Sequence, residues 1–97
     1  MKAPEEIIIN PIVSEKTMRL IEEENTYCFK VAENSNKVEI GKAIEKLFDV
    51  EVENVNTVNM RGKKRSLGRQ SEGKRPDWKK AYITLSRGDR IEVVEGV

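Results

Sequence analysis

The chain contains no histidine and a single cysteine, Cys28, among its 97 residues. Without these residue types no Cys/His metal site can be assembled, and neither a Ser-His nor a Cys-His nucleophile pair is possible. One cysteine also excludes an intrachain disulfide and fits a reducing compartment. We therefore expect no enzyme activity, no cofactor and no metal, although composition leaves carboxylate and lysine chemistry open.

Long apolar runs are also missing. None approaches the roughly 20 residues that a membrane-spanning helix needs, and the N-terminal stretch MKAPEEIIINP lacks the layout of a signal peptide. With 37% hydrophobic and 36% charged residues, the chain has room for one domain with a modest core. We expect a single cytoplasmic domain over residues 1–97 that does not associate with membranes and is monomeric when free.

Positive charge is concentrated between Arg61 and Lys80, in the sequence RGKKRSLGRQSEGKRPDWKK. Nine of these twenty residues are basic and two are acidic, which leaves nine basic and fifteen acidic residues in the rest of the chain. The net charge of +1 therefore conceals a segment of about +7 and a remainder of about −6. Such a split is typical of a protein that meets a polyanion.

The periodicity of apolar residues predicts strands that alternate with helices. Ser14 is expected to cap the first helix, and Asn36 with Glu39 resembles a capping box at the start of the second. Gly41 lies inside the second helix, so we expect it on a closely packed or exposed side. Strands are expected at residues 7–9, 27–31, 54–60 and 80–85, helices at residues 15–24 and from Asn36 to Phe48, and Ile91, Val93 and Val94 suggest a last short strand.

This order, β-α-β-α-β-(long basic hairpin loop)-β, predicts an α+β fold. We expect a small antiparallel β-sheet flanked by two helices, with the last two major strands paired antiparallel. The basic loop over residues 61–77 is far longer than the two to five residues of a usual hairpin connection. Arginine forks and lysine ammonium groups match phosphate oxygens, and Trp78 offers a flat face at the root of the loop. The loop is predicted to bind nucleic acid, with a merely solubilising loop as the alternative, and charge alone does not choose between DNA and RNA.

Several short stretches together match the order and spacing of a known family. They are Pro11-Ile-Val-Ser-Glu-Lys16, Lys46-Leu-Phe48, Val55-Asn-Thr57, Gly62-Lys63 through Arg69, Trp78-Lys-Lys-Ala81 and Thr84-Leu85. In this combination the chain resembles ribosomal protein twenty-three of the large subunit. The order and spacing of these stretches match over nearly the whole chain. The long basic loop is similar to that of the bacterial or organellar form.

The resemblance implies a domain that binds large-subunit rRNA beside the peptide exit tunnel and contacts neighbouring large-subunit ribosomal proteins. From the residues alone, Ser14 can equally be a helix cap, and Asn56 and Thr57 can be polar residues on a strand face. Carried over by position, the implied rRNA contacts are Ser14, Lys16, Asn56, Thr57, Arg61, Lys63, Lys64, Arg65, Arg69, Lys74, Arg75, Trp78, Lys79 and Lys80.

The resemblance also implies that Glu15 helps to dock trigger factor and lies near the site of the signal recognition particle on the ribosome. The alternative interpretation is that Glu15 is a first-turn carboxylate that stabilises the helix, through its dipole, by about 0.3–1 kcal/mol. Two other classes of function remain open: a free-standing nucleic-acid-binding regulator, and an adaptor that grips an acidic protein. Neither predicted helix is basic enough to enter a DNA groove.

Overall fold

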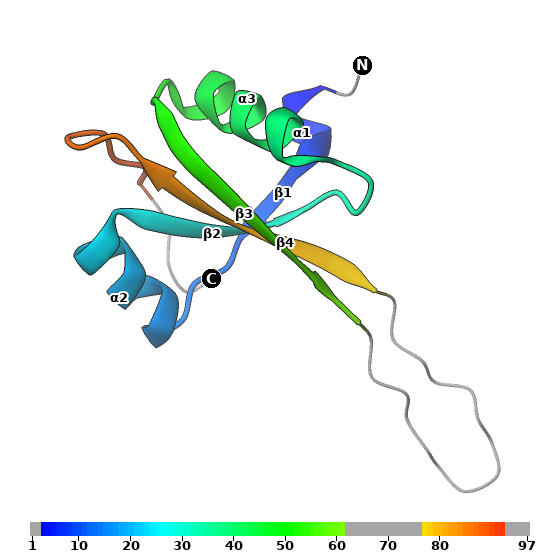
Figure 1. The fold of residues 1–97 in the computed structure, drawn as a ribbon, viewed down its shortest axis with the longest axis horizontal. Coiled ribbons are helices and arrows are strands. Elements are labelled where there is room, and N and C mark those ends of the chain that lie inside the picture. The colour runs from blue at the N-terminus through cyan, green and yellow to red at the C-terminus, as the bar shows by residue number, and fades with distance from the viewer. Residues whose placement is uncertain (1–2, 62–76, 93–97) are drawn as a thin grey trace, which may run out of the picture.

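The computed structural model describes residues 3–61 and 77–92. The strands form one antiparallel sheet in the order β1-β2-β4-β3 (Figure 1). This confirms the predicted α+β class and the antiparallel pairing of the last two strands. The elements are α1 (Pro4–Ile7), β1 (Ile8–Pro11), α2 (Glu15–Glu24), β2 (Thr26–Val31), α3 (Lys37–Phe48), β3 (Val52–Met60) and β4 (Trp78–Leu85).

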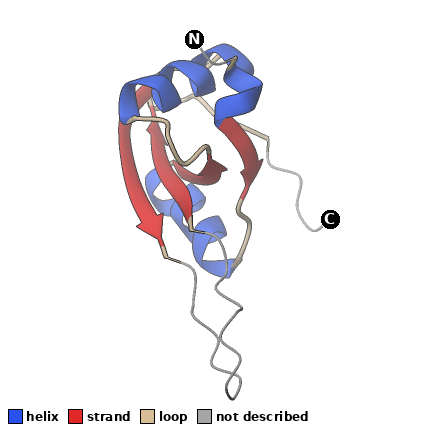
Figure 2. Ribbon diagram, turned by 90° about the vertical axis from the view of Figure 1, so that its right-hand side faces the viewer, coloured by secondary structure: helices blue, strands red, loops and turns tan. Residues whose placement is uncertain are grey.

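Helices cover both faces of the sheet. The helices α1 and α3 lie on one side of it and α2 on the other, as Figure 1 and Figure 2 show. The strand β2 runs between these two layers, and five of its six residues are buried. Because side chains alternate along a strand, Cys28 points to the α2 side, whereas Phe29 points to the α3 side. Burial on both faces leaves Lys30 as the one partly exposed residue of this strand.

The hydrophobic core lies between the sheet and α3. Ile40 and Ile44 of α3 and Ile83 of β4 are fully buried. The ring of Phe29 packs against that of Phe48, with 5.7 Å between the ring centroids. The α3 positions Ile40, Ile44 and Phe48 recur four residues apart, as the apolar pattern predicts for a helix with one buried face. The core therefore fixes the sheet against α3 and leaves part of the opposite face for other contacts.

Both predicted helix starts are confirmed by their capping hydrogen bonds. The Ser14 hydroxyl oxygen accepts from the Thr17 amide at 3.2 Å, at the start of α2. At the start of α3 the Asn36 side chain accepts from the Glu39 amide at 2.8 Å, and the Glu39 carboxylate accepts from the Asn36 amide at 3.0 Å. These bonds satisfy amides that have no partner within the helix, so the helices begin where the polar residues place them.

Gly41 lies on the side of α3 that faces β3. A Cβ atom added to it would lie 3.6 Å from a methyl group of Val55 and 3.9 Å from a methyl group of Val52. Both distances are ordinary van der Waals contacts. Gly41 thus occupies the closely packed side, as one of the two expectations had it, yet the space there does not by itself require a glycine.

The N-terminal elements differ from the prediction. Ile7 was expected to begin a strand, but it ends the short helix α1, a third helix that the sequence analysis had not included. Pro4 suits the first turn of α1 because its missing amide hydrogen would have no helical partner there, and the Glu6 carboxylate accepts from the Ala3 amide at 3.1 Å. The strand β1 then continues through Pro11, which is tolerated because β1 is an edge strand.

Other strand boundaries differ as well, since β2 begins at Thr26 rather than at residue 27 and β4 begins at Trp78 rather than at residue 80. The strand β3 begins at Val52 rather than at Asn54, and its pairing with β4 shifts register between these residues. The slip in the apolar pattern therefore marks a bulge-type irregularity within the strand and not its start. Ile91, predicted to lie in a strand, lies outside the strands of the described residues, where it is buried and its amide donates to the Tyr27 hydroxyl at 3.1 Å. Val93 and Val94 lie outside the described residues.

Candidate nucleic-acid interface

The basic segment leaves from the end of a regular antiparallel hairpin. The strands β3 and β4 stay in register until Met60 pairs with Trp78. Arg61 follows β3 with an exposed side chain, and Asp77 precedes β4. Of the basic segment, the structure therefore describes only the root of the hairpin, which consists of Arg61 and the residues from Asp77 onward. The other candidates of the segment, Lys63, Lys64, Arg65, Arg69, Lys74 and Arg75, lie outside the described residues.

Two lysines and two aromatic rings share one face of the sheet beside this root, and we call Lys30, Trp78, Lys80 and Tyr82 the lysine–aromatic face. Lys30 and Lys80 are direct partners across β2 and β4, and Trp78, Lys80 and Tyr82 alternate along β4. The Lys30 ammonium lies 5.8 Å from the ring centroid of Trp78, and the Lys80 ammonium lies 5.3 Å from that of Tyr82. Each ammonium is thus held over an aromatic ring at cation–π distance.

Lys16, in the first turn of α2, adds charge on the same side of the sheet. Burial raises the pKa of the Cys28 thiol, while the charge of Lys80, a hydrogen bond with the Tyr82 side chain and the charge of Lys16 act in the opposite direction. Both lysines therefore lie within electrostatic reach of Cys28, and the raised pKa keeps the thiol protonated at neutral pH. Two of the predicted contacts, Lys16 and Lys80, therefore bring their positive charges close to one another around Cys28.

Other predicted contacts are distributed over both faces. Asn56 is exposed and lies opposite Tyr82, on the lysine–aromatic face, whereas Thr57 lies opposite Ala81 on the face that α3 covers. Lys79 also belongs to that second face, and its ammonium donates to the carbonyl oxygen of Ser35 at 2.6 Å. The structure therefore brings Lys16, Asn56, Trp78 and Lys80 to one side and separates Thr57 and Lys79 from them.

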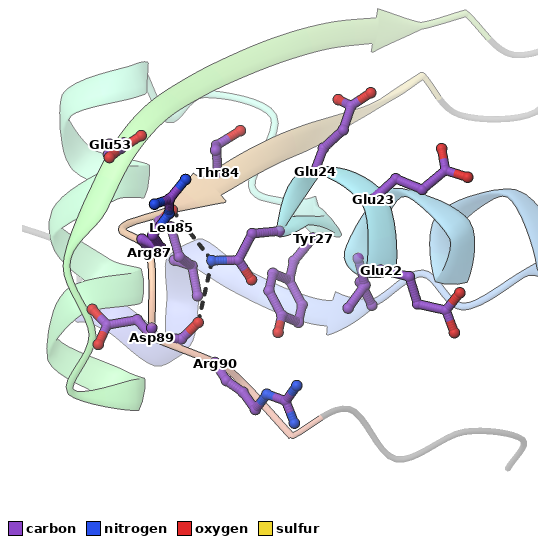
Figure 3. Close-up of a pocket in the computed structure, with 13 residues that line it drawn as sticks. Glu22, Glu23, Glu24, Tyr27, Glu53, Thr84, Leu85, Arg87, Asp89 and Arg90 are labelled. Carbon is purple, nitrogen blue, oxygen red and sulfur yellow. Dashed lines mark hydrogen bonds between the residues drawn. The ribbon is translucent and has the colours of Figure 1, made fainter.

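The opposite end of the molecule is acidic. Around the hollow shown in Figure 3, acidic side chains come from the last turn of α2, from β3 and from the turn after β4. They are Glu22, Glu23, Glu24, Glu53 and Asp89, beside Arg87 and Arg90. The lining includes Leu85, the last residue of β4, whereas Trp78 at the hairpin root is the first. A polyanion is therefore attracted to one end of β4 and repelled by the acidic residues at the other.

Glu15 occupies the first turn of α2 with an exposed side chain. Its neighbour Ser14 forms the helix cap, so both expected roles of these residues in starting the helix are present. Glu15 lines a shallow hollow along α2, whose other lining residues are Val13, Ser14, Met18, Arg19, Glu22 and Glu23. A carboxylate beside partly exposed apolar side chains is suited to contact another protein.

Comparison with known proteins identifies the family. The family model of ribosomal protein L23 matches residues 6–93. The chain belongs to the ribosomal protein L23 family. The large ribosomal subunit protein uL23 of Alkalilimnicola ehrlichii is 50% identical over 91 residues, which cover 94% of this chain and 91% of that protein. The uL23 protein of Syntrophotalea carbinolica is 48% identical over 93 residues, which cover 96% of this chain and 97% of that protein. The uL23 protein of Heliobacterium modesticaldum is 42% identical over 97 residues, which cover all of both chains.

Membership in the L23 family confirms the resemblance found in the sequence. It makes the chain a ribosomal protein, with a structural rather than a catalytic role. Within residues 3–61 and 77–92, no group of three or more histidine, cysteine or acidic side chains is placed to hold a metal ion. In the same part of the chain no helix is both long enough and apolar enough to cross a membrane.

Two residues of the interface were missed because they lie outside the charged segment or carry no charge. Lys30 lies about thirty residues before the segment in sequence, and only the pairing of β2 with β4 places it beside Lys80. Tyr82 was assigned to a strand without a function. The alternation of Lys30 with Phe29 and Val31 did indicate that Lys30 faces away from the core. The sequence of this L23-family chain does not by itself show that β2 pairs with β4, so the lysine–aromatic face could not be predicted from it.

Proposed function

We propose that this chain binds large-subunit rRNA beside the peptide exit tunnel, as a structural constituent of the large subunit of the cytoplasmic ribosome in contact with neighbouring ribosomal proteins. The observation that carries the proposal is the lysine–aromatic face, which lies at the root of a segment of about +7. The L23-family relatives, which are named large ribosomal subunit proteins, support it.

The proposed rRNA contacts fall into three groups. On the side of the lysine–aromatic face, Lys16 and Lys80 supply charge to phosphates and Asn56 and Trp78 supply a polar group and a ring, while Arg61 adds charge at the root. Lys79 and Thr57 lie on the other face, and Lys79 keeps two of its three donors for a phosphate after its bond to the Ser35 carbonyl. The contacts proposed from sequence alone are Lys63, Lys64, Arg65, Arg69, Lys74 and Arg75, with Ser14 at the start of α2.

Affinity measurements against three kinds of ligand test this function. We expect the protein to prefer one fragment of large-subunit rRNA over a DNA duplex and over an acidic protein at physiological salt. The logarithm of the affinity should fall linearly with the logarithm of salt concentration, by about 0.7–0.9 for each phosphate contacted. Equal affinity for every duplex would instead support a free-standing regulator, and preference for the acidic protein would support an adaptor.

We further propose that Glu15 docks trigger factor on the ribosome and lies near the site of the signal recognition particle. The exposed carboxylate and the hollow beside Val13 and Met18 support this. Ribosomes that carry Glu15→Ala are expected to bind trigger factor about tenfold more weakly, because a charge-assisted hydrogen bond is lost. Binding of trigger factor to purified ribosomes measures the effect.

The control for Glu15→Ala is Glu24→Ala, which removes an exposed carboxylate from the last turn of the same helix, outside the hollow that Glu15 lines. Both variants should assemble into ribosomes normally, because loss of a first-turn carboxylate costs only about 0.3–1 kcal/mol of helix stability. If the ribosomes with Glu15→Ala keep the chaperone affinity of those with Glu24→Ala, the docking role is wrong, while the rRNA proposal is unaffected.

A further inference from the structure

The two aromatic rings of the lysine–aromatic face already hold cations. One face of the Trp78 ring carries the Lys30 ammonium at 5.8 Å, and one face of the Tyr82 ring carries the Lys80 ammonium at 5.3 Å. A nucleic-acid base that stacked on either of these ring faces would have to displace a lysine and lose the cation–π contact. The rings therefore act as supports that position the two ammonium groups.

The two ammonium groups point in different directions along β4. Lys30 and Lys80 are cross-strand partners, a like-charge pairing that destabilises a sheet when nothing neutralises it. Lys30 reaches toward Trp78, and Lys80 reaches toward Tyr82, four residues farther along β4, which corresponds to roughly 13 Å of strand. The pair therefore presents two separated cations, a spacing suited to two phosphate groups that are not adjacent in one strand.

Neutral amides accompany the two lysines. Asn10 on β1 is the cross-strand partner of Lys30, and Asn56 on β3 is the cross-strand partner of Tyr82. Both asparagines are exposed. An amide both donates and accepts hydrogen bonds, so it can pair with the 2′-hydroxyl of a ribose, a group that is regularly displayed along the wide minor groove of an RNA helix.

We infer that the lysine–aromatic face binds the backbone of a double-helical RNA segment through phosphates and ribose hydroxyls, and does not stack unpaired bases. This inference rests on the proposed rRNA binding and deepens it, because it assigns the form of RNA and the contact residues Lys30 and Lys80. It assigns Trp78 and Tyr82 a positioning function for the two lysines. Helical RNA is recognised mostly through such backbone contacts, whereas single strands are recognised by stacking and base edges.

The test uses the full chain and three ligands of one sequence: an RNA duplex of about 16 base pairs, its single strand and the DNA duplex. We expect the RNA duplex to bind most tightly. The double variant Lys30→Gln/Lys80→Gln should weaken duplex binding about tenfold and reduce the slope of the salt dependence by about two, one for each lost phosphate contact. The matched control, Lys37→Gln/Lys42→Gln, removes the same charge from exposed positions of α3 and should leave more of the affinity intact.

The single tryptophan of the chain, Trp78, gives an independent readout. Bound RNA is expected to leave its fluorescence nearly unquenched, since no base stacks on the ring, and Tyr82→Phe, which keeps the ring, should bind the duplex as the unmodified protein does. Tighter binding of the single strand with strong quenching would overturn the inference and leave rRNA binding intact. Equal duplex affinity of the Lys30→Gln/Lys80→Gln and control variants, with both folded by circular dichroism, would also overturn it. Failure of the unmodified protein to bind the large-subunit rRNA fragment contradicts the proposed function itself.

Discussion

Replacement of residues 62–76 by the dipeptide Asn-Gly is expected to leave the sheet folded and to lower the affinity for large-subunit rRNA by at least about 100-fold. The replaced stretch contains six basic residues and one acidic residue. Each lost phosphate contact reduces the dependence of affinity on salt, so the slope of that dependence should fall by up to about six. Fluorescence anisotropy with one rRNA fragment at several salt concentrations measures both quantities.

The fold should survive this excision because the hairpin is closed without the replaced residues. Met60 and Trp78 are the last pair of the two strands, and Arg61 and Asp77 are the residues that follow and precede them in the chain. Asn-Gly is the preferred two-residue connection between paired strands, since its turn matches the twist of a hairpin. A shorter connection also costs less closure entropy, by roughly 2 kcal/mol, so the free energy of unfolding should stay the same or rise.

A second variant separates the charge of the segment from its length. In it, every lysine and arginine of residues 62–76 is replaced by glutamine, which keeps the chain length unchanged. If phosphate contacts dominate, this variant and the excision should lose similar affinity. An excision variant that binds the rRNA fragment within about threefold of the unmodified protein would contradict the proposal that the segment carries most of the binding.

Much of the fold could be predicted because its signals are local. Ser14 and Asn36 cap helices through bonds to residues three positions away, and Ile40 and Ile44 mark the buried face of α3 at helical spacing. The helix α1 and the start of β3 were not predicted correctly, because their local signals are weak. Four residues are too few for a helical period to be visible, and a bulge near Asn54 interrupts the alternation by which a strand is recognised.

The candidate site was predictable only where charge is contiguous in sequence. The basic residues of 61–80 are visible as a run, and Lys80 and Trp78 at its end do lie on the lysine–aromatic face. Lys30 and the separation of Lys79 from Lys80 depend instead on strand pairing and on the alternation of side chains across a sheet. Neighbouring residues of a charged run therefore point to opposite faces, which composition cannot reveal.

Asn25 joins the end of α2 to the far end of β4 and the turn after it. Its backbone is left-handed, with φ of 53°, and its amide closes the last turn of the helix by donating to the Ile21 carbonyl at 3.1 Å. The side-chain amide donates to the carbonyl oxygens of Leu85, Ser86 and Asp89 at 3.3, 3.1 and 3.2 Å, and Figure 3 shows the bonds that reach Leu85 and Asp89. This side chain therefore ties the C-terminal end of α2, the helix that carries Lys16 and Glu15, to the end of β4.

The substitution Asn25→Ala is expected to lower the free energy of unfolding by about 2–5 kcal/mol. Alanine in the left-handed region costs about 1–2 kcal/mol, and the loss of the amide leaves part-buried carbonyl oxygens without their donor, at about 1–3 kcal/mol. Urea unfolding, followed by circular dichroism, measures the change. A protein of this size has roughly 5–15 kcal/mol of stability, so the variant should still fold but with a clearly lower midpoint.

Two glycine variants separate the backbone and side-chain contributions at Asn25. Glycine adopts the left-handed conformation without strain. Asn25→Gly should therefore lose only the stability that the three carbonyl contacts contribute, about half of the free energy of unfolding that Asn25→Ala loses. Asp49→Gly is the matched control, because Asp49 is also left-handed, with φ of 56°, at the end of α3. It is exposed and should tolerate glycine with little change. If Asn25→Gly proves as stable as the unmodified protein, the contacts with Leu85, Ser86 and Asp89 contribute no net stability, and α2 is held in place by its packing against β2.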